Sequence, residues 1–187
     1  MHTLALVAGD NVHDQLSPFS LLLEVEPYEV LVSDDEIGAM AEHYAVSRDD
    51  LATLVTKLVD YFGDEGFLRD GKLVHISKAN RQGHFDWYEV GGQWKGFLRL
   101  RQPRQVRRFF GLLSAGETTQ ATSARKVEID PQALLADPPM ALLFRGKWFE
   151  SPIFAVGDFA EKWKTEFAQL FAEIPDDVML TVVDIHS

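Results

Sequence analysis

The chain has 187 residues, no cysteine, a formal net charge of −11 and a pI near 4.9. The acidic balance argues against a general affinity for nucleic-acid backbones or anionic membranes, because both need clustered Lys and Arg. The lack of cysteine excludes disulfides, thiolate metal sites and a cysteine nucleophile, and it fits the reducing cytoplasm. No apolar run approaches the ~18 residues needed to span a bilayer, and no cationic segment leads into the apolar start as in a signal peptide.

The first half of the chain predicts short strands and amphipathic helices. Apolar and β-branched runs bounded by turn residues are typical of strands, and apolar residues three or four apart are typical of helices. The expected elements are a strand at Thr3 to Ala8, an extended segment at Tyr28 to Val32, helices at Asp34 to Tyr44 and Ser47 to Phe62, and a hairpin around Asp70-Gly71. Ser47 is expected to cap the second helix with Asp50, and Gly63 to end it.

The second half predicts more strands, a loop and a long helix. The same patterns give two strands joined across Gly91-Gly92-Gln93, and a capping box at Asp158 and Glu161 opens the helix. The expected elements are strands at His84 to Val90 and Trp94 to Leu100, a flexible loop at about 113–126, a hairpin of Ala141 to Phe144 with Trp148 to Ile153, a helix from Asp158 to Ile174, and a closing strand at Met179 to Ile185.

This order favours an α+β fold. Helices and strands are partly segregated along the chain, which is less typical of a doubly wound parallel sheet. We therefore expect one domain over residues 1–187, with an antiparallel or mixed sheet and two or three packed helices. The first and last strands both look buried, so we expect them to lie centrally and side by side.

Three motifs carry a resemblance to a known family. They are the strand ending at Gly9-Asp10 with the following Gln15-Leu16-Ser17-Pro18-Phe19, the central Asp86-Trp87-Tyr88-Glu89-Val90-Gly91-Gly92-Gln93-Trp94, and the final Val182-Val183-Asp184-Ile185-His186. The chain resembles a family of uncharacterised bacterial and phage proteins with a central Trp-Asp-Trp-Tyr, one variable residue, then Ile-Gly-Gly-Arg-Trp. The resemblance implies a shared fold and an origin in a mobile element, and it implies no reaction.

The chain departs from the family pattern at three positions. Phe85 stands where the first Trp is usual, Gln93 replaces the Arg, and Ile185 replaces a Cys. If the family's Arg binds an anion, Gln93 puts that role in doubt for this chain.

The aromatic block is the first candidate site. Aromatic walls with polar ends and a close-approaching backbone are typical of a ligand pocket. The residues expected to bind a ligand are Asp86, Trp87, Tyr88, Gly91, Gly92 and Trp94. The structural alternative is a corner of the core in which the indole and phenol groups are satisfied internally.

The chain ends form the second candidate site. Asp184 and His186 project from one face of a strand, and antiparallel pairing with the first strand would bring His2 beside His186. Two imidazoles and a carboxylate can hold a divalent metal ion, or an Asp–His pair can act as a general base. The alternative is solvated polar side chains at fraying ends.

A basic segment is the third candidate. Arg99 and Arg101 share a strand face, Arg104 follows, and aromatic residues lie nearby, which would suit an anionic partner. The alternative is an exposed edge that neutralises acidic surface. No phosphate-binding loop, His-Glu-x-x-His or Gly-x-Ser-x-Gly motif is present.

The leading hypothesis is therefore a small cytoplasmic, non-catalytic binding or accessory protein related to phage proteins. It would need no cofactor and would hold a protein or small-molecule ligand, with neither membrane nor nucleic acid as partner. The alternative is a metal-dependent hydrolase that uses His2, Asp184 and His186. A third hypothesis is a homodimer formed through an exposed aromatic surface.

Overall fold

The structure is a computed structural model that describes residues 1–106, 116–152 and 157–186. These residues form six α-helices and eleven strands, which confirms the α+β class. Their contacts divide the chain into two compact units, one of Met1–Leu21 with Gln82–Ser187 and the other of Leu22–Arg81. The extent of a single domain over residues 1–187 stays a prediction.

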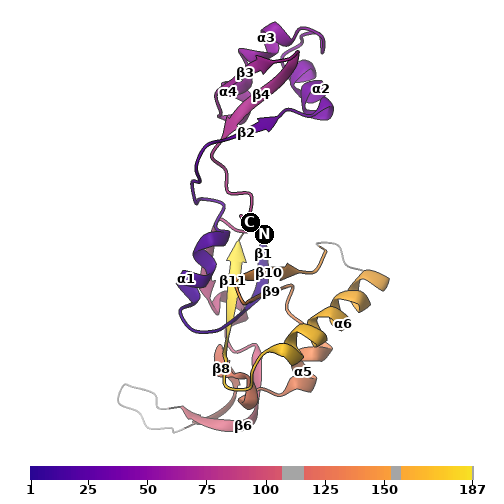
Figure 1. Ribbon diagram of the computed structural model, residues 1–187. Helices are drawn as coiled ribbons and strands as arrows, with labels where there is room; N and C mark the ends of the chain where they lie inside the picture. The colour runs from indigo at the N-terminus through magenta and orange to yellow at the C-terminus, as the bar shows by residue number, and fades with distance from the viewer. Residues whose placement is uncertain (107–115, 153–156, 187) are drawn as a thin grey trace. The chain divides into compact units, whose positions relative to one another are not determined.

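The first unit is built on a mixed sheet with the two end strands at its centre. The strand order is β10 (Lys147–Glu150), β9 (Ala141–Phe144), β1 (His2–Ala8), β11 (Met179–His186) and β5 (Trp87–Val90). Strand β1 is parallel to β9 and antiparallel to β11, with His2 opposite His186. The expected central and adjacent position of the end strands is confirmed, and the chain termini lie together in Figure 1.

One face of this sheet is covered by α5 (Pro131–Ala136) and α6 (Asp158–Glu173), which lie on the same side of it in Figure 1. Trp163, Phe167 and Phe171 recur at helical spacing on α6 and pack against Leu4 and Leu6 of β1. The same apolar spacing places Phe159 on that face, but this residue, in the first turn of α6, is 61% exposed. Gly157, not Asp158, occupies the N-cap, so the predicted capping box does not form.

The opposite face is covered by α1 (Val12–Leu16) and the short 3-10 turn η1 (Ser17–Phe19). Leu16 and Phe19 from these segments, with Phe85, pack against Ala5 and Val7 of β1. Side chains of β1 therefore alternate between two apolar clusters, which explains why this strand is apolar along nearly its whole length.

The segment after β5 differs from the predicted hairpin. Gly92–Trp94 form the 3-10 turn η2, and the next strand, β6 (Leu98–Val106), pairs with β7 (Gly116–Ala121) instead of β5. Residues 116–126, expected in a flexible loop, form β7, then β8 (Ser123–Arg125), which pairs with β11, and the start of η3 (Lys126–Glu128). Pairing with β6 and β11 satisfies the backbone of this polar segment; residues 113–115 lie outside the described residues.

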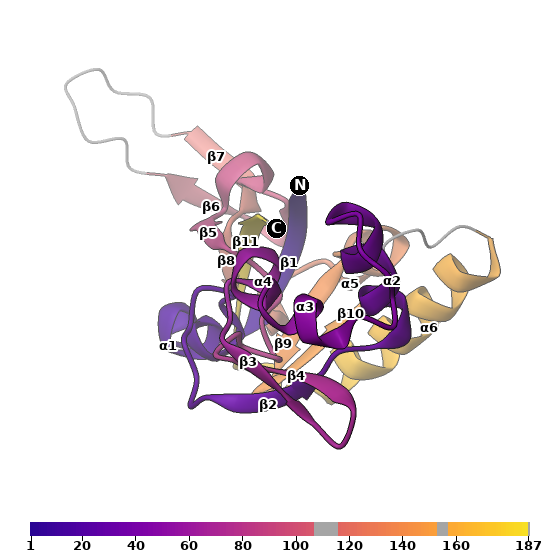
Figure 2. The ribbon, with the colours of Figure 1, turned by 90° about the horizontal axis from the view of Figure 1, so that it is seen from above.

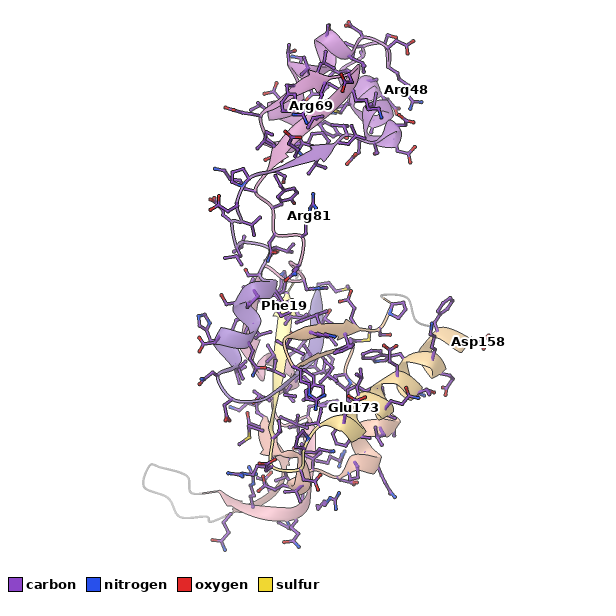
Figure 3. The ribbon with its side chains drawn as sticks, in the orientation of Figure 1. Phe19, Arg48, Arg69, Arg81, Asp158 and Glu173 are labelled. Atoms are coloured by element: carbon purple, nitrogen blue, oxygen red, sulfur yellow. The ribbon has the colours of Figure 1, made fainter. Side chains whose placement is uncertain are left out.

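The second unit is a three-stranded antiparallel sheet with three short helices packed on it (Figure 2). The strand order is β2 (Tyr28–Leu31), β4 (Lys72–Ser77) and β3 (Gly66–Arg69). The Asp70-Gly71 hairpin is confirmed, with φ of 51° and 71° at its two turn residues. Arg69, labelled in Figure 3, makes a bidentate ion pair with Glu29 across this sheet.

The helices of the second unit are α2 (Asp34–His43), α3 (Leu51–Val55) and α4 (Leu58–Phe62). Ser33 and Glu36 form a capping box at α2. The single helix predicted from Ser47 to Phe62 begins only at Leu51, with Asp50 rather than Ser47 as its cap. It is interrupted after Val55, where the Thr56 hydroxyl donates to the Thr53 carbonyl. Among the described residues, no helix is long and apolar enough to cross a membrane.

Candidate functional site

Two of the predicted sites meet at one end of the central sheet. Strand β11 pairs with β1 on one side and β5 on the other, so His186 lies opposite both His2 and Trp87. Directly opposed residues of antiparallel strands share a face. The chain ends and the aromatic block therefore form one group of side chains, His2, Trp87, Asp184 and His186, which we call the histidine–tryptophan cluster.

The buried carboxylate of Asp184 is the base of this cluster. Its side chain is only 4% exposed, whereas that of His2 is 45% exposed. Oδ1 of Asp184 lies 3.0 Å from Nδ1 of His2, and Oδ2 accepts a hydrogen bond of 3.0 Å from the backbone N–H of Gln93. A buried charge needs such partners, and they rule out the solvated, fraying end that was the alternative for Asp184.

Three rings stand above this carboxylate. The His186 and Trp87 rings are stacked, with centroids 5.1 Å apart and an interplanar angle of 15°. His2 meets both rings edge to face, at 5.0 Å from His186 and 6.0 Å from Trp87. Trp87 is 47% exposed, and Nδ1 of His186 is buried without a hydrogen-bond partner among the described residues. The cluster thus presents the half-exposed ring of Trp87 near a buried carboxylate that two contacts hold in place.

The glycine pair brings the backbone against Asp184. Gly91 and Gly92 have φ of 81° and 43°, and a Cβ at Gly92 would lie 2.4 Å from both Cβ and Oδ2 of Asp184. The N–H of Gly91 donates to the Val182 carbonyl, so the turn is anchored on β11. The Gly-Gly sequence is therefore explained by the close approach that lets Gln93 bind Asp184.

The other residues of the predicted aromatic site lie elsewhere. Tyr88 projects from the opposite face, where its hydroxyl lies 2.8 Å from Nδ1 of His13. Burial, and then the nearby carboxylate of Asp14, raise the pKa of Tyr88. Trp94 packs against the core, but its indole Nε1 is buried without a hydrogen-bond partner among the described residues, whereas the structural alternative expected it to be satisfied. Asp86 is exposed, with its backbone N–H bound to the His186 carbonyl.

Two arginines of the predicted anion site, Arg101 and Arg104, make contacts within the chain. Arg101 donates through Nε to the Ile129 carbonyl at 2.9 Å, and Arg104 pairs with Glu128. The hydrogen bond from Arg104 holds the pKa of Glu128 below its ordinary value. Arg99 is exposed on β6, while Arg107, Arg108, Phe109 and Phe110 lie outside the described residues. The arrangement favours the alternative of a neutralised edge.

The histidine–tryptophan cluster can orient an imidazole and present aromatic surface. A carboxylate that holds Nδ1 of a histidine fixes its tautomer and directs Nε2 outward, an arrangement found both in general bases and behind metal ligands. Within the described ranges, no group of three or more His, Asp or Glu side chains is placed to hold a metal ion. Both carboxylate oxygens of Asp184 already have partners within the chain. The imidazole rings of His2 and His186 are therefore the groups that remain to act as metal ligands.

Sequence reasoning missed a second polar group at the same end of the sheet. His84 stacks on Trp148, with centroids 4.7 Å apart, and its Nδ1 lies 3.3 Å from Oε2 of Glu150. Phe19, labelled in Figure 3, lies 5.6 Å from the Trp148 ring. His84 and Glu150 border a pocket of about 370 Å³. His84 and Glu150 are far apart in the chain, so the sequence carries no local signal of their contact. The sequence predicted only a strand that begins at Trp148.

A larger hollow of about 870 Å³ lies in the second unit and is bordered by Ser33, Arg48, Asp49 and Lys72. Of the two basic residues on its border, Arg48 donates a hydrogen bond to the Asp34 carbonyl. Residues 22–81 carry thirteen Asp and Glu against six Lys and Arg, which disfavours nucleic acid as a partner for this unit.

No family model, curated protein or solved structure matches the chain. The resemblance to bacterial and phage proteins therefore stays a prediction.

Proposed function

We propose that the chain is a non-catalytic binding or accessory protein whose recognition surface is the histidine–tryptophan cluster. One observation carries this proposal. The Trp87 side chain is 47% exposed, and its stack on His186 holds the ring in place. Tryptophan is enriched among the few residues that dominate binding energy at interfaces, and a preorganised ring loses little entropy on binding. The cytoplasmic setting and the phage-like origin belong to the same proposal and rest on the sequence alone.

The charge of the site favours a basic partner. The Asp184 carboxylate lies beneath the rings, and Glu89, directly opposite Asp184 on β5, is exposed. An Arg or Lys side chain can lie over the Trp87 ring in a cation–π contact worth about 0.5–1 kcal/mol at an exposed site. The net charge of −11 would draw such a partner toward the protein. We therefore propose a basic protein segment as the ligand.

Synthetic peptides test this proposal. A fluorescein-labelled Gly-Arg repeat peptide is titrated with the full chain at low salt, beside a Gly-Gln repeat of the same length. We expect measurable binding of the basic peptide alone and at least tenfold weaker binding after Trp87→Ala. Phe159→Ala is the matched control, because Phe159 is an exposed aromatic residue on α6, away from β5.

Two results would overturn it. One is equal binding of the basic and neutral peptides, and the other is equal loss in the Trp87 and Phe159 variants. Self-association through the cluster is a distinct outcome. Light scattering over a concentration series would then detect a dimer, and Trp87→Ala would dissociate it. In that case the ligand is a second copy of the chain and not a basic segment.

A metal-dependent hydrolase is the second candidate function. It is supported by the hydrogen bond between Nδ1 of His2 and Asp184, which is the outer contact that metal-bound histidines usually make. Elemental analysis of protein purified without a histidine tag should then find stoichiometric zinc or manganese. Absence of bound metal, together with an unchanged melting temperature on adding either ion, would reject this candidate and leave the binding proposal in place.

A further inference from the structure

The pocket bordered by His84 and Glu150 lies around the end of the central sheet, toward the face opposite the Asp184 carboxylate. Thr3 and Ile185 alternate along their strands with His2, Asp184 and His186, so their side chains point to the other face. The residues bordering the pocket include Thr3, His84, Met140, Ala141, Glu150 and Ile185. Met1, His2, Gly83 and Ser151 complete its border.

The carboxylate of Glu150 is the main charged group of this pocket, and its position is fixed. Oε2 accepts a hydrogen bond of 2.8 Å from the Trp148 indole N–H and lies 3.3 Å from Nδ1 of His84. The His84 ring is in turn stacked on Trp148 at 17°. The Glu150 side chain is still 49% exposed, so it retains acceptor capacity for a ligand.

Glu150 favours a positively charged ligand at its side of the pocket. No Lys or Arg side chain is among the described residues that border the pocket, although Met1, which carries the α-amino group of the chain, also borders it. An anion that lay against Glu150 would meet a carboxylate of the same charge. A protonated amine would make a charge-assisted hydrogen bond to Glu150.

The remaining border suits a small apolar group. Met140, Ala141 and Ile185 supply hydrocarbon surface, and a volume of about 370 Å³ is at the lower end of small-molecule sites. We infer that this pocket binds a small primary amine that carries an apolar or aromatic group. The inference goes beyond the proposed function, because it concerns a different ligand and a different set of side chains.

Calorimetric titrations of the full chain with three ligands of similar size test the inference. Benzylamine is cationic, benzyl alcohol is neutral and benzoate is anionic at neutral pH. We expect benzylamine to bind in the millimolar range or better, benzyl alcohol at least tenfold more weakly, and benzoate not at all.

Variants then assign the binding to this pocket. Glu150→Gln keeps an oxygen for the Trp148 indole but removes the charge, and it should abolish the preference for the amine. Met140→Trp should block the pocket without touching the carboxylate. Glu89→Gln, an exposed carboxylate on β5, and Trp87→Ala should both leave benzylamine binding unchanged, which separates this site from the surface of the proposed function.

The inference is overturned if benzyl alcohol binds as tightly as benzylamine, if benzylamine does not bind at millimolar concentration, or if Glu150→Gln and Met140→Trp both bind it like the wild type. Near-ultraviolet circular dichroism of each variant establishes that it has folded before its affinity is compared.

Discussion

His2 and Asp184 are separated by 182 positions in the sequence, and their side chains meet through a 3.0 Å contact between Nδ1 and Oδ1. This contact depends on the antiparallel pairing of β1 with β11, which sets His2 beside the strand that carries Asp184. All four tryptophans of the chain, Trp87, Trp94, Trp148 and Trp163, belong to the same unit, so their fluorescence reports its unfolding.

Replacing the carboxylate should destabilise the first unit. In Asp184→Asn the side-chain NH₂ either opposes the Gln93 N–H, which then loses its acceptor, or faces Nδ1 of His2 and requires the tautomer in which that nitrogen accepts. In both cases the charge on the acceptor is lost. We expect a loss of about 2 kcal/mol in the free energy of unfolding. Urea denaturation followed by tryptophan fluorescence measures it. Glu89→Gln, opposite Asp184 but exposed, should change stability by less than about 0.5 kcal/mol; equal losses would contradict this account.

The close approach at Gly92 gives a second prediction. Gly92→Ala adds a Cβ 2.4 Å from Asp184 at a φ of 43°. The matched control is Gly146→Ala, where φ is 69° and nothing lies within 4 Å of the added Cβ. Both variants carry the cost of a left-handed residue, about 1–2 kcal/mol. We expect Gly92→Ala to lose roughly 2 kcal/mol more through overpacking. Melting curves that superimpose would show that the contact is unimportant.

Neighbouring aromatic residues should differ in their contribution to stability. Phe85 is 2% exposed and packs under β1, so Phe85→Ala should cost about 3–5 kcal/mol. Trp87 is half exposed on the outer strand of the sheet, and Trp87→Ala should cost about 1 kcal/mol, mainly its stack on His186. Chemical denaturation compares the two. If Trp87→Ala unfolds the protein, the residue belongs to the core and the proposed recognition surface is wrong.

The capping box at α2 predicts a dependence on pH. The side-chain hydrogen bond from Ser33 lowers the pKa of Glu36. The resulting stability is present above the unfolded-state pKa of Glu, about 4.3, and is lost as pH falls through the lower folded value. Ser33→Ala should cost about 1 kcal/mol at pH 7 and less near pH 3. Amide hydrogen exchange in α2 measures this; a difference that stays constant with pH would contradict the role of Glu36.

Local sequence signals predicted the helices and strands better than they predicted which elements pair or pack together. Asp70-Gly71 and Arg145-Gly146 were sufficient to predict two hairpins, because their positive φ angles are a local requirement. The nearly continuous apolar run of β1 made its central position predictable, and in the structure this run packs into two apolar clusters. In contrast, the apolar periodicity of residues 51–62 continues through Thr56, and Leu54 and Leu58 lie in one core on either side of it, so the periodicity gives no sign of the break in the helix.

The candidate site was predictable in its residues but not in its assembly. The sequence pointed separately to Trp87 and to His2, Asp184 and His186. Their union depends on β5 pairing with β11 rather than with the strand that follows it. The roles of Gln93 and Glu150 were out of reach for the same reason, since a backbone donor and a partner 66 positions from His84 leave no periodic trace.

The placement of β1 between β9 and β11 also has a consequence for synthesis on the ribosome. Strand β1 is synthesised first, but it cannot pair with β9 and β11 until residues 141–186 have been translated. Its apolar side chains therefore stay without these packing partners through most of elongation. Residues 22–81 make their own sheet and core from nearby sequence and can fold in the meantime. Nascent chains stalled before β11 should therefore be cleaved by protease at β1, whereas the second unit, residues 22–81, should already be protected.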